Sequence, residues 1–230
     1  MAIKVGMVSL GCAKNQVDGE MLMANLKNAG FELCDDAALA DVAIVNTCGF
    51  IDSAKQESID EILELATLKK EGRIKKIVVT GCLAERYREE IHKELPEVDG
   101  VFGIGANADI AACIESAMND FTESFPEKSK MPLCGERELS TPGYFAYIKI
   151  AEGCDNKCTY CAIPMIRGGY RSRPKADILA EVKTLAAQGV KEFTLDTTRY
   201  GTDNGEESQL PQLIEEIAAI PGVEWLRALY

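Results

Sequence analysis

The chain has 230 residues, of which 47% are hydrophobic and 27% charged, and its formal net charge at pH 7 is −12. Its length allows one large domain or two smaller ones. No apolar run approaches the roughly eighteen residues of a bilayer span, and the N-terminus is typical of a first strand rather than a secretory signal, so we expect a cytoplasmic protein with no membrane partner. The acidic balance disfavours non-specific binding to a polyanion and favours a basic partner.

The first half alternates buried apolar runs with helical periodicity, which predicts an α/β fold with a parallel, helix-covered sheet. After the turn-prone pair Lys14-Asn15, the helical spacing starts near Val17. The predicted strands are 3–10, 31–34, 41–46, 75–80 and 101–104, and the predicted helices are 17–28, 52–70, 85–95 and 108–118.

Three of the nine cysteines directly follow predicted strands: Cys12, Cys48 and Cys82, each beside a glycine. In an open parallel sheet, sites form at the carboxyl ends of strands, near a switch point in the strand order. The three thiols are therefore candidates for a shared metal site. Small apolar cysteines filling strand ends are the alternative, and spacing alone does not decide between the two. Cys34, Cys113 and Cys134 share no such setting and are interpreted as ordinary cysteines.

Residues 121–143 are rich in proline and glycine and indicate a domain boundary, which divides the chain into 1–137 and 138–230. Beyond it, strands at 144–150, 191–196 and 223–230 alternate with helices at 174–188 and 210–220. This pattern is typical of the start of a (β/α) barrel, whose functional loops follow the carboxyl ends of its strands. A complete barrel takes about 200 residues or more, so we expect an incomplete barrel and a truncated chain.

The strongest signal lies in the loop 152–161, Glu-Gly-Cys-Asp-Asn-Lys-Cys-Thr-Tyr-Cys. The spacing Cys-x₃-Cys-x₂-Cys places Cys154, Cys158 and Cys161 so that they can bind three irons of one cubane cluster and leave the fourth iron open. Structural zinc sites use paired Cys-x₂-Cys instead, and no second pair or histidine partner follows. A chance grouping of cysteines is the remaining alternative.

The segment 148–175 is locally basic although the whole chain is acidic, so it either meets an anionic group or forms a solvated face. Its basic residues are Lys149, Lys157, Arg167, Arg171, Arg173 and Lys175.

The three-cysteine loop, with Tyr160 before its last cysteine, resembles the signature of radical S-adenosylmethionine (SAM) enzymes. In that family the open iron binds the amino and carboxylate groups of SAM. The resemblance implies SAM contacts at Tyr160, Asp196 and Thr197, because the turn after the strand 191–196 shares a face with the cysteine loop. It assigns no catalytic acid or base.

Taken whole, the chain resembles the methylthiotransferases of this superfamily, which hold a second 4Fe-4S cluster in an N-terminal α/β domain. The resemblance implies that residues 1–137 form this domain, with Cys12, Cys48 and Cys82 as ligands, and that 138–230 begin the radical SAM barrel. Within the family, the stretches 9–18, 46–51 and 80–83 are most similar to RimO-type enzymes, which modify an aspartate of a small-subunit ribosomal protein. Two departures are Gly19, where serine is usual, and Leu195, where glutamine is usual.

The implied reaction removes hydrogen from the aspartate β-carbon with a radical derived from SAM, and then adds sulfur and a methyl group. It needs an electron donor such as flavodoxin or ferredoxin. Three other functions compete with this one: a MiaB-type tRNA (adenosine) methylthiotransferase, a non-catalytic iron–sulfur electron carrier and a zinc-binding scaffold. The acidic balance weighs against a tRNA substrate without excluding nucleic acid.

Overall fold

The computed structural model describes residues 2–203 and 207–229. Its residue contacts divide the chain into two compact units, Met1–Pro132 and Leu133–Tyr230. The observed division follows Pro132, whereas the composition of the linker predicts a boundary after residue 137. Within the described ranges, no helix is long and apolar enough to cross a bilayer.

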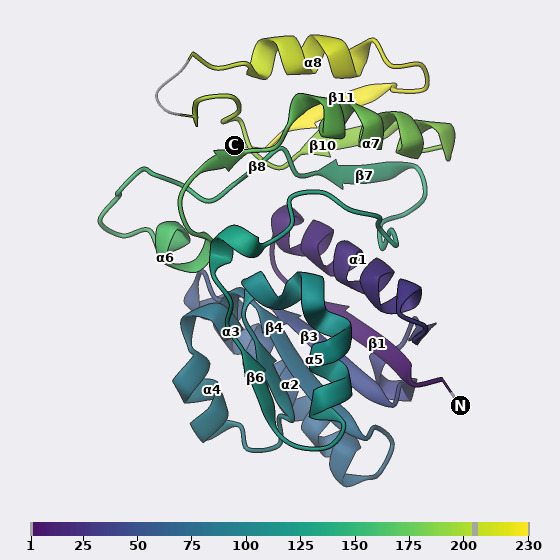
Figure 1. Cartoon of the computed structure of the whole chain (residues 1–230), viewed down its shortest axis with the longest axis vertical. Coiled ribbons are helices and arrows are strands. Elements are labelled where there is room, and N and C mark those ends of the chain that lie inside the picture. Colours follow the sequence, from purple (N-terminus) through teal and green to yellow (C-terminus); the bar gives the residue numbers. More distant parts are fainter. Residues whose placement is uncertain (1, 204–206, 230) are drawn as a thin grey trace. The chain divides into compact units, whose positions relative to one another are not determined.

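The first unit is built on one parallel six-stranded sheet with the order β2-β1-β3-β4-β5-β6 (Figure 1), which confirms the predicted α/β class. Its strands are β1 (Lys4–Ser9), β2 (Glu32–Cys34), β3 (Val42–Thr47), β4 (Lys76–Gly81), β5 (Gly100–Phe102) and β6 (Thr122–Ser124). Its α-helices are α1 (Ala13–Asn28), α2 (Asp52–Lys70), α3 (Cys82–Arg86), α4 (Arg88–Glu94) and α5 (Ile110–Ala117). The chain leaves β1 toward β2 on one side and reaches β3 on the other, so the order reverses between β1 and β3.

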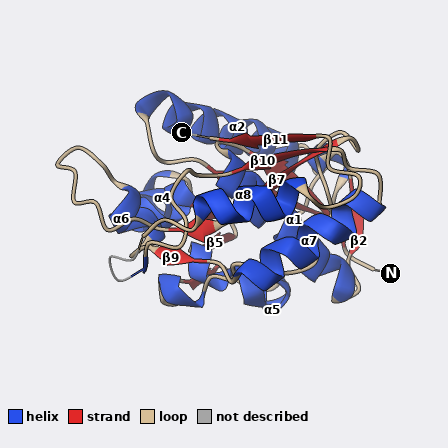
Figure 2. Ribbon diagram, turned by 90° about the horizontal axis from the view of Figure 1, so that it is seen from above, coloured by secondary structure: helices blue, strands red, loops and turns tan. Residues whose placement is uncertain are grey.

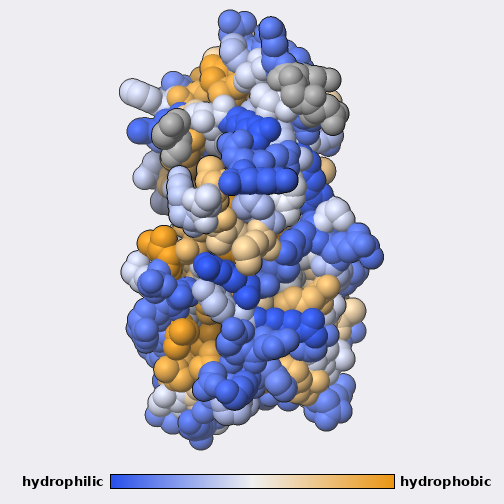
Figure 3. Space-filling model, turned by 90° about the vertical axis from the view of Figure 1, so that its left-hand side faces the viewer, coloured by the Kyte–Doolittle hydropathy of each residue, from blue (hydrophilic) through white to orange (hydrophobic). Residues whose placement is uncertain are grey.

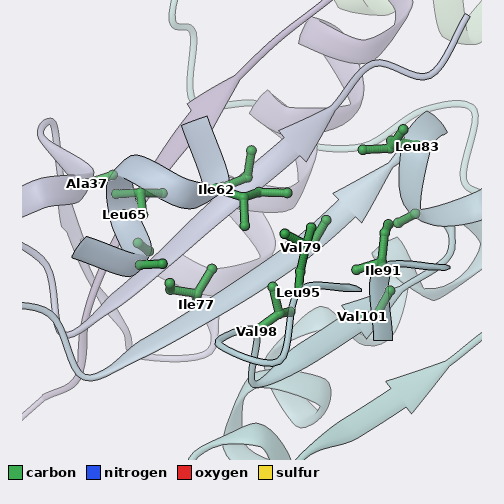
Figure 4. Packing of buried hydrophobic residues seen from close by; sticks show 14 of the residues in the cluster. Ala37, Ile62, Leu65, Ile77, Val79, Leu83, Ile91, Leu95, Val98 and Val101 are labelled. Atoms are coloured by element: carbon green, nitrogen blue, oxygen red, sulfur yellow. The ribbon is translucent and has the colours of Figure 1, made fainter. Parts of the chain in front are cut away.

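Residues alternate between the two faces of this sheet, as the period of a β-strand requires. In β3, Ala43 and Val45 belong to a core that includes residues of α2, α3 and α4, while Val42 and Ile44 belong to a second core with α1 and α5. Figure 4 shows the first core, where Ile62 of α2 and Ile91 of α4 lie over the strands. Helices therefore cover both faces, as a parallel sheet with apolar strands requires.

Three local differences separate this unit from the elements expected from sequence. Helix α1 begins at Ala13 rather than near Val17, and the single helix expected at 85–95 is replaced by α3 and α4, which meet at Tyr87. Strand β6 lies in the segment interpreted as a linker. At three residues it is too short to show a recognisable alternation of apolar and polar residues. Its hydrogen bonding to β5, and not its own sequence, makes it a strand.

The second unit contains a parallel sheet with the order β11-β10-β7. Its strands are β7 (Phe145–Ile148), β10 (Glu192–Leu195) and β11 (Trp225–Ala228), and its longer helices are α7 (Lys175–Ala187) and α8 (Leu210–Ala218). Both helices contribute to the core of this sheet and are seen from above in Figure 2. Three short elements frame the cysteine loop: β8 (Ala151–Glu152), α6 (Ile163–Arg167) and β9 (Arg171–Ser172).

Candidate functional site

Cys12, Cys48 and Cys82 lie at the carboxyl ends of three strands that are neighbours in the sheet. Cys12 caps the N-terminus of α1 after β1, Cys48 follows β3, and Cys82 opens α3 directly after β4. The register pairs Ser9 with Asn46 and Thr47 with Gly81, so the three strands end at nearly the same level. The reversal of strand order between β1 and β3 places this edge where open α/β sheets form their sites.

The loop that carries Cys12 touches Cys48 directly. Gly11 has a φ of 95°, and a Cβ added there would lie 2.8 Å from Cys48 Cβ and 3.0 Å from its Sγ. Only a glycine combines this left-handed backbone with so close an approach. The two cysteine loops therefore depend on this glycine for their contact.

Buried amide side chains hold the same two loops. Asn15 is 1% exposed, and its side-chain amide donates to the carbonyl oxygens of Leu10 (2.7 Å), Asn46 (3.2 Å) and Thr47 (3.3 Å). Asn46 returns a hydrogen bond of 2.7 Å from its own amide to the Asn15 carbonyl. Each asparagine thus satisfies backbone groups where the ladder of β1 and β3 ends.

The Cys48 loop is held on its other side by α2 and α3. The Cys48 N–H donates to Ser58 Oγ at 3.1 Å, and Arg86 donates to the carbonyl of Gly49 at 2.9 Å. The Thr47 hydroxyl donates to the carbonyl of Thr80, which precedes the turn to Cys82. Hydrogen bonds of this kind fix the backbone from which the thiols project.

Cysteine thiolates are the usual ligands of iron–sulfur clusters, so the chemistry of these three side chains is compatible with such a cluster. Across residues 2–203 and 207–229, no three or more His, Cys, Asp or Glu side chains converge closely enough to hold one metal ion. A cubane cluster requires less convergence, because each thiolate binds a different iron and the ligands stand farther apart. Cys12 is exposed, Cys48 is half-buried and Cys82 is buried, so this edge is open to solvent on the Cys12 side.

The second group of cysteines lies on the loop between β8 and α6. The Cys154 N–H donates to the Gly168 carbonyl at 3.1 Å, the Cys161 N–H to the Cys158 carbonyl at 3.1 Å, and the Asn156 N–H to Cys154 Sγ at 3.4 Å. Cys158 is exposed, while Cys154 and Cys161 are half-buried. The loop therefore presents three thiols on a closed backbone, an arrangement suited to a cluster with one open iron.

A buried cluster of charged side chains lies beside this loop and fixes its two ends. The Glu152 carboxylate is fully buried and accepts hydrogen bonds from Arg167 (3.1 Å), Lys149 (3.5 Å) and the Gly153 N–H (2.9 Å). A buried carboxylate is tolerable only when it is paired and hydrogen-bonded in this way. Glu152 thus fixes β8 and α6, the two elements between which the cysteines lie.

The basic residues of 148–175 do not form one solvated face. Lys149 is fully buried, and Arg167 and Arg173 are 3% and 4% exposed. Lys149 and Arg167 pair with Glu152, and Arg173 pairs with Glu181. The solvated face is therefore wrong for these three residues, and the anionic groups that they meet are carboxylates of the chain itself.

The three residues expected to bind SAM differ in their surroundings. Asp196 is buried, and its carboxylate accepts a hydrogen bond of 2.8 Å from the Ile150 N–H. Thr197 is half-buried, and its hydroxyl accepts from the Arg199 N–H. Tyr160 is 89% exposed. Asp196 links the end of β10 to the chain entering the cysteine loop, and SAM binding at these three positions stays a prediction.

Sequence reasoning missed the residues that position the thiols. The turn-prone pair Lys14-Asn15 predicts a turn, yet Asn15 lies inside α1 and is buried. Glu152 and Ser58 gave no signal, because their partners are selected by tertiary contact. At Gly19, an added Cβ would lie 2.8 Å from Met7 Cε, the flexible end of a side chain, and 3.0 Å from the Asn46 amide nitrogen.

The other three cysteines show no common setting. Cys113 is in the core formed with α1 and α5, where burial raises the pKa of its thiol. Cys34 donates to the Asp36 carbonyl, and Cys134 lies 3.8 Å from the Asp177 carboxylate.

Two family models match the chain. Residues 4–103 match the family described as "Uncharacterized protein family UPF0004", and residues 148–224 match the radical SAM superfamily. The second match includes Cys154, Cys158 and Cys161, and the first includes Cys12, Cys48 and Cys82. Iron–sulfur clusters and SAM are the cofactors of the superfamily.

Curated relatives align with nearly the whole chain. The ribosomal protein uS12 methylthiotransferase RimO of Clostridioides difficile is 48% identical over 239 residues, covering 99% of this chain and 52% of that protein. The enzyme of the same name from Acetivibrio thermocellus is 48% identical over 242 residues, covering 100% of this chain and 53% of that protein. The chain thus spans about half the length of the curated relatives it matches.

Solved structures support the fold. The radical SAM methyltransferase TsrM from Kitasatospora setae superposes with a TM-score of 0.62 at 16% identity, covering 94% of this chain and 51% of TsrM. The cobalamin-dependent SAM radical enzyme OxsB superposes with a TM-score of 0.55 at 13% identity, covering 94% of this chain and 37% of OxsB. With family models matching residues in both halves and RimO sequences aligned along its length, the chain is similar to about half of a radical SAM methylthiotransferase.

Proposed function

We propose that this chain is the cluster-binding part of a methylthiotransferase that adds sulfur and a methyl group to the β-carbon of an aspartate in a small-subunit ribosomal protein. One observation carries the proposal: Cys12, Cys48 and Cys82 end three neighbouring strands of a chain that also has the Cys-x₃-Cys-x₂-Cys loop. A radical generator alone needs only the loop. The three thiols at the sheet edge provide a separate site at which the sulfur to be transferred can be held.

The two groups of residues have different roles in this proposal. Cys154, Cys158 and Cys161 hold the cluster with the open iron, and Glu152 keeps their loop in place through β8 and α6. Cys12, Cys48 and Cys82 hold a second 4Fe-4S cluster, positioned by Asn15, Asn46 and Ser58. When bound, the open-iron cluster and SAM supply the one-electron chemistry that an unactivated C–H bond requires.

Asp196 and Thr197 contribute to SAM binding in this proposal, because they follow the strand beside the one that enters the cysteine loop. Asp196 already accepts the Ile150 N–H, so it acts on SAM through its remaining acceptor positions. Tyr160, which is exposed, contributes through its backbone or ring. An electron donor such as flavodoxin or ferredoxin completes the system, and a ribosomal substrate places the reaction in the cytoplasm.

The substrate is tested by mass spectrometry of small-subunit ribosomal proteins and of tRNA from a strain in which the gene has been deleted. We expect one ribosomal protein to lose the mass of a methylthio group while tRNA modification is unchanged. Loss of methylthio-adenosine from tRNA instead would assign the chain to the tRNA-modifying branch and contradict the proposed substrate. The net charge of −12 and the names of the relatives both favour the protein substrate.

A further inference from the structure

The segment 170–173 of the second unit, which contains β9, connects the cysteine loop with the loop that follows β10. On one side, the Tyr170 N–H donates to the carboxylate of Asp155 at 2.9 Å, and Asp155 directly follows Cys154. On the other side, the guanidinium of Arg199 lies over the Tyr170 ring, 3.9 Å from its centroid. Tyr170 is therefore in contact with both of the loops to which the proposed function assigns SAM.

The loop 197–203 is held against β9 by hydrogen bonds of Ser172, while β9 itself pairs with β8. The Gly201 N–H donates to Ser172 Oγ at 2.9 Å, and the Ser172 N–H donates to the carboxylate of Asp203 at 3.0 Å. The Tyr170 hydroxyl lies 2.9 Å from the same Ser172 Oγ. The ring and the hydroxyl of Tyr170 thus both take part in the contact between the two loops.

The stacking of Arg199 on Tyr170 holds the first turn of this loop. The Arg199 N–H donates to the Thr197 hydroxyl at 3.1 Å, and its Nε donates to Thr202 Oγ1 at 2.7 Å. Arg199 Nη1 is buried and has no hydrogen-bond acceptor among the described residues, so attraction to the ring is what offsets its burial. Asp203 also attracts Arg199, but this attraction acts within the loop.

Solvent weakens charge pairs at the surface of this unit. The face of the second unit seen in Figure 3 carries much hydrophilic surface. Exposed pairs such as Lys191–Glu224 contribute little to holding two segments together. Arg199 and Tyr170 are instead half-buried, and the attraction between a cation and an aromatic ring increases when the cation is desolvated. This contact therefore holds the two loops together better than a surface ion pair would.

We propose that Tyr170 is a positioning residue for SAM, which acts through Arg199 to keep Thr197 at a fixed place relative to the cysteine loop. This inference rests on the proposed function, in which SAM takes contacts from both loops. When the stacking is lost, a smaller fraction of the protein has both loops in the binding position. The apparent dissociation constant of SAM then rises by the same factor.

The core anchors the loop when Tyr170 is changed. Tyr200 is 3% exposed and belongs to the core of the second unit, and its hydroxyl donates to the Arg173 carbonyl at 3.0 Å. Variants of Tyr170 should therefore fold, and circular dichroism and thermal unfolding check that they do. If Tyr170→Ala did not fold, Arg199→Ala would remove the same stacking from the other side.

The test measures SAM binding to the oxidised, cluster-reconstituted protein by equilibrium dialysis with radiolabelled SAM. Binding that remains in Cys158→Ala is subtracted, because it does not depend on the cluster of the cysteine loop. Iron content and the electron paramagnetic resonance signal of the reduced protein without SAM show whether the clusters are intact. The rate of 5′-deoxyadenosine release over a range of SAM concentrations separates KM from kcat.

Three variants separate the ring of Tyr170 from its hydroxyl and from Arg199. Tyr170→Ala removes the ring and the hydroxyl, Tyr170→Phe keeps the ring, and Arg199→Ala removes the cation. Tyr144→Ala is the matched control. Tyr144 is 60% exposed and precedes β7, at the end of that strand away from the cysteine loop.

We expect Tyr170→Ala and Arg199→Ala each to raise the dissociation constant and the KM of SAM by about tenfold. Because saturating SAM restores the aligned loops, kcat should stay within about twofold of the parent, with iron content and the reduced signal unchanged. Tyr170→Phe and Tyr144→Ala should bind SAM within about threefold of the parent. The double variant Tyr170→Ala/Arg199→Ala should bind no more weakly than the single variants, because the two side chains form one contact.

A loss of about a hundredfold in the double variant would mean that the two side chains act separately, and it would overturn the proposal. So would unchanged SAM binding in Tyr170→Ala, a full loss in Tyr170→Phe, an equal loss in Tyr144→Ala, or a fall in iron content that accompanies the weaker binding.

Failure of this inference and failure of the proposed function are distinguishable. If the parent binds SAM and Tyr170→Ala binds it equally well, the inference alone is wrong. If the parent binds no more SAM than Cys158→Ala does, the SAM site itself is wrong and the inference is overturned with it. A parent that shows the expected differences in SAM binding but modifies no ribosomal protein would retain the positioning role and lose the proposed substrate.

Discussion

At the scale of single residues, the two groups of thiols differ in what surrounds them. Cys12, Cys48 and Cys82 come from sequence-distant strand ends and are aligned by side chains such as Asn15 and Ser58. Cys154, Cys158 and Cys161 lie within eight positions on one loop, and their backbone is closed largely by hydrogen bonds of that loop. The first group therefore depends on the fold and the second mainly on local sequence.

If the proposed function holds, removing one thiol from each group should separate two activities. Cys158→Ala should abolish SAM cleavage, because the loop then holds its cluster by two thiolates only. Cys48→Ala should leave SAM cleavage intact and stop thiolation, because only the second cluster is lost. Iron content, release of 5′-deoxyadenosine and product mass check both variants. Normal thiolation by either one would disprove the assignment of its ligands, and Cys34→Ala is the control that should change nothing.

Asn15→Ala should weaken the site of Cys12, Cys48 and Cys82 without removing any of its thiols. It removes the amide that serves three backbone carbonyls, at an expected cost of about 1–3 kcal/mol in unfolding free energy. Because the Cys12 and Cys48 loops are then less well aligned, bound iron should also fall. Measuring iron and the electron paramagnetic resonance signal in a background without Cys154, Cys158 and Cys161 isolates this cluster.

A matched control is Asn28→Ala, at the exposed last residue of the same helix. It should leave both iron content and stability close to those of the parent. If Asn15→Ala lowers stability but retains a full complement of iron with an unchanged signal, Asn15 is a structural residue only.

At the scale of elements, the site depends on where strands end and loops turn. β1, β3 and β4 end together, and α1 begins immediately after Cys12. In the second unit, β8 and β9 pair around the cysteine loop, with Glu152 opposite Arg171. The pairing of β8 and β9 thus brings together the two ends of the segment that carries Cys154, Cys158 and Cys161.

Gly153→Ala should disrupt this closure. Gly153 has a φ of 68°, and a Cβ there would lie 2.1 Å from the Gly169 carbonyl oxygen, so both backbone strain and overlap oppose any side chain. We expect a loss of about 1–3 kcal/mol of stability, together with loss of the loop cluster and of SAM cleavage. Gly143→Ala is the control, because a Cβ at Gly143 meets no atom within 4 Å. Equal effects of the two substitutions on iron content would contradict this account.

Asp41 joins the amino ends of three strands and should make stability depend on pH. Its carboxylate accepts the Lys4 N–H at 3.0 Å and pairs with Lys75 at 2.8 Å. The Lys75 hydrogen bond and that from the Lys4 N–H hold the pKa of Asp41 below its usual value. A depressed folded-state pKa stabilises the fold above the unfolded-state pKa of about 3.9, and this stabilisation is lost as the pH falls through the folded-state value.

Asp41→Asn should therefore cost about 1 kcal/mol near neutral pH, and the difference from the parent should shrink below about pH 4. Urea unfolding across this range measures it. A difference that does not change with pH would show that the charge of Asp41 contributes nothing.

At the scale of the whole molecule, stability comes from apolar cores that helices and sheet form together. Ile62 is fully buried in the core shared by α2 and the sheet, and its neighbour Leu63 is 45% exposed. Ile62→Ala should cost about 2–5 kcal/mol, because it removes buried methyl groups and leaves a cavity, whereas Leu63→Ala should cost about 0.5 kcal/mol or less. The urea midpoint of the first unit measures both, and similar costs would mean that α2 packs differently.

The sequence was sufficient for most long elements and for the α/β class, because buried parallel strands are continuous apolar runs and amphipathic helices repeat at a fixed spacing. It failed for β6, β8, β9 and α6, which are two to five residues long and too short for any periodicity. It also failed at Asn15, which has the composition of a turn residue but is buried within α1 because α1 starts beside Cys12. At Asn15, tertiary packing therefore overrides the preference of asparagine for turns.

By itself, the sequence determined which atoms are available as ligands: three thiols within one loop, whose spacing needs no fold to be recognised, and three more placed after apolar runs. Only the tertiary structure decided that Cys12, Cys48 and Cys82 lie at one edge of the sheet, because this placement depends on the strand order β1-β3-β4 and on a common register, which are properties of the sheet and not of any segment. Only the tertiary structure likewise decided that Glu152, Lys149 and Arg167 form a buried ion cluster. Their charges are visible in the sequence, but only folding buries them against one another, where each is tolerated because the others are present.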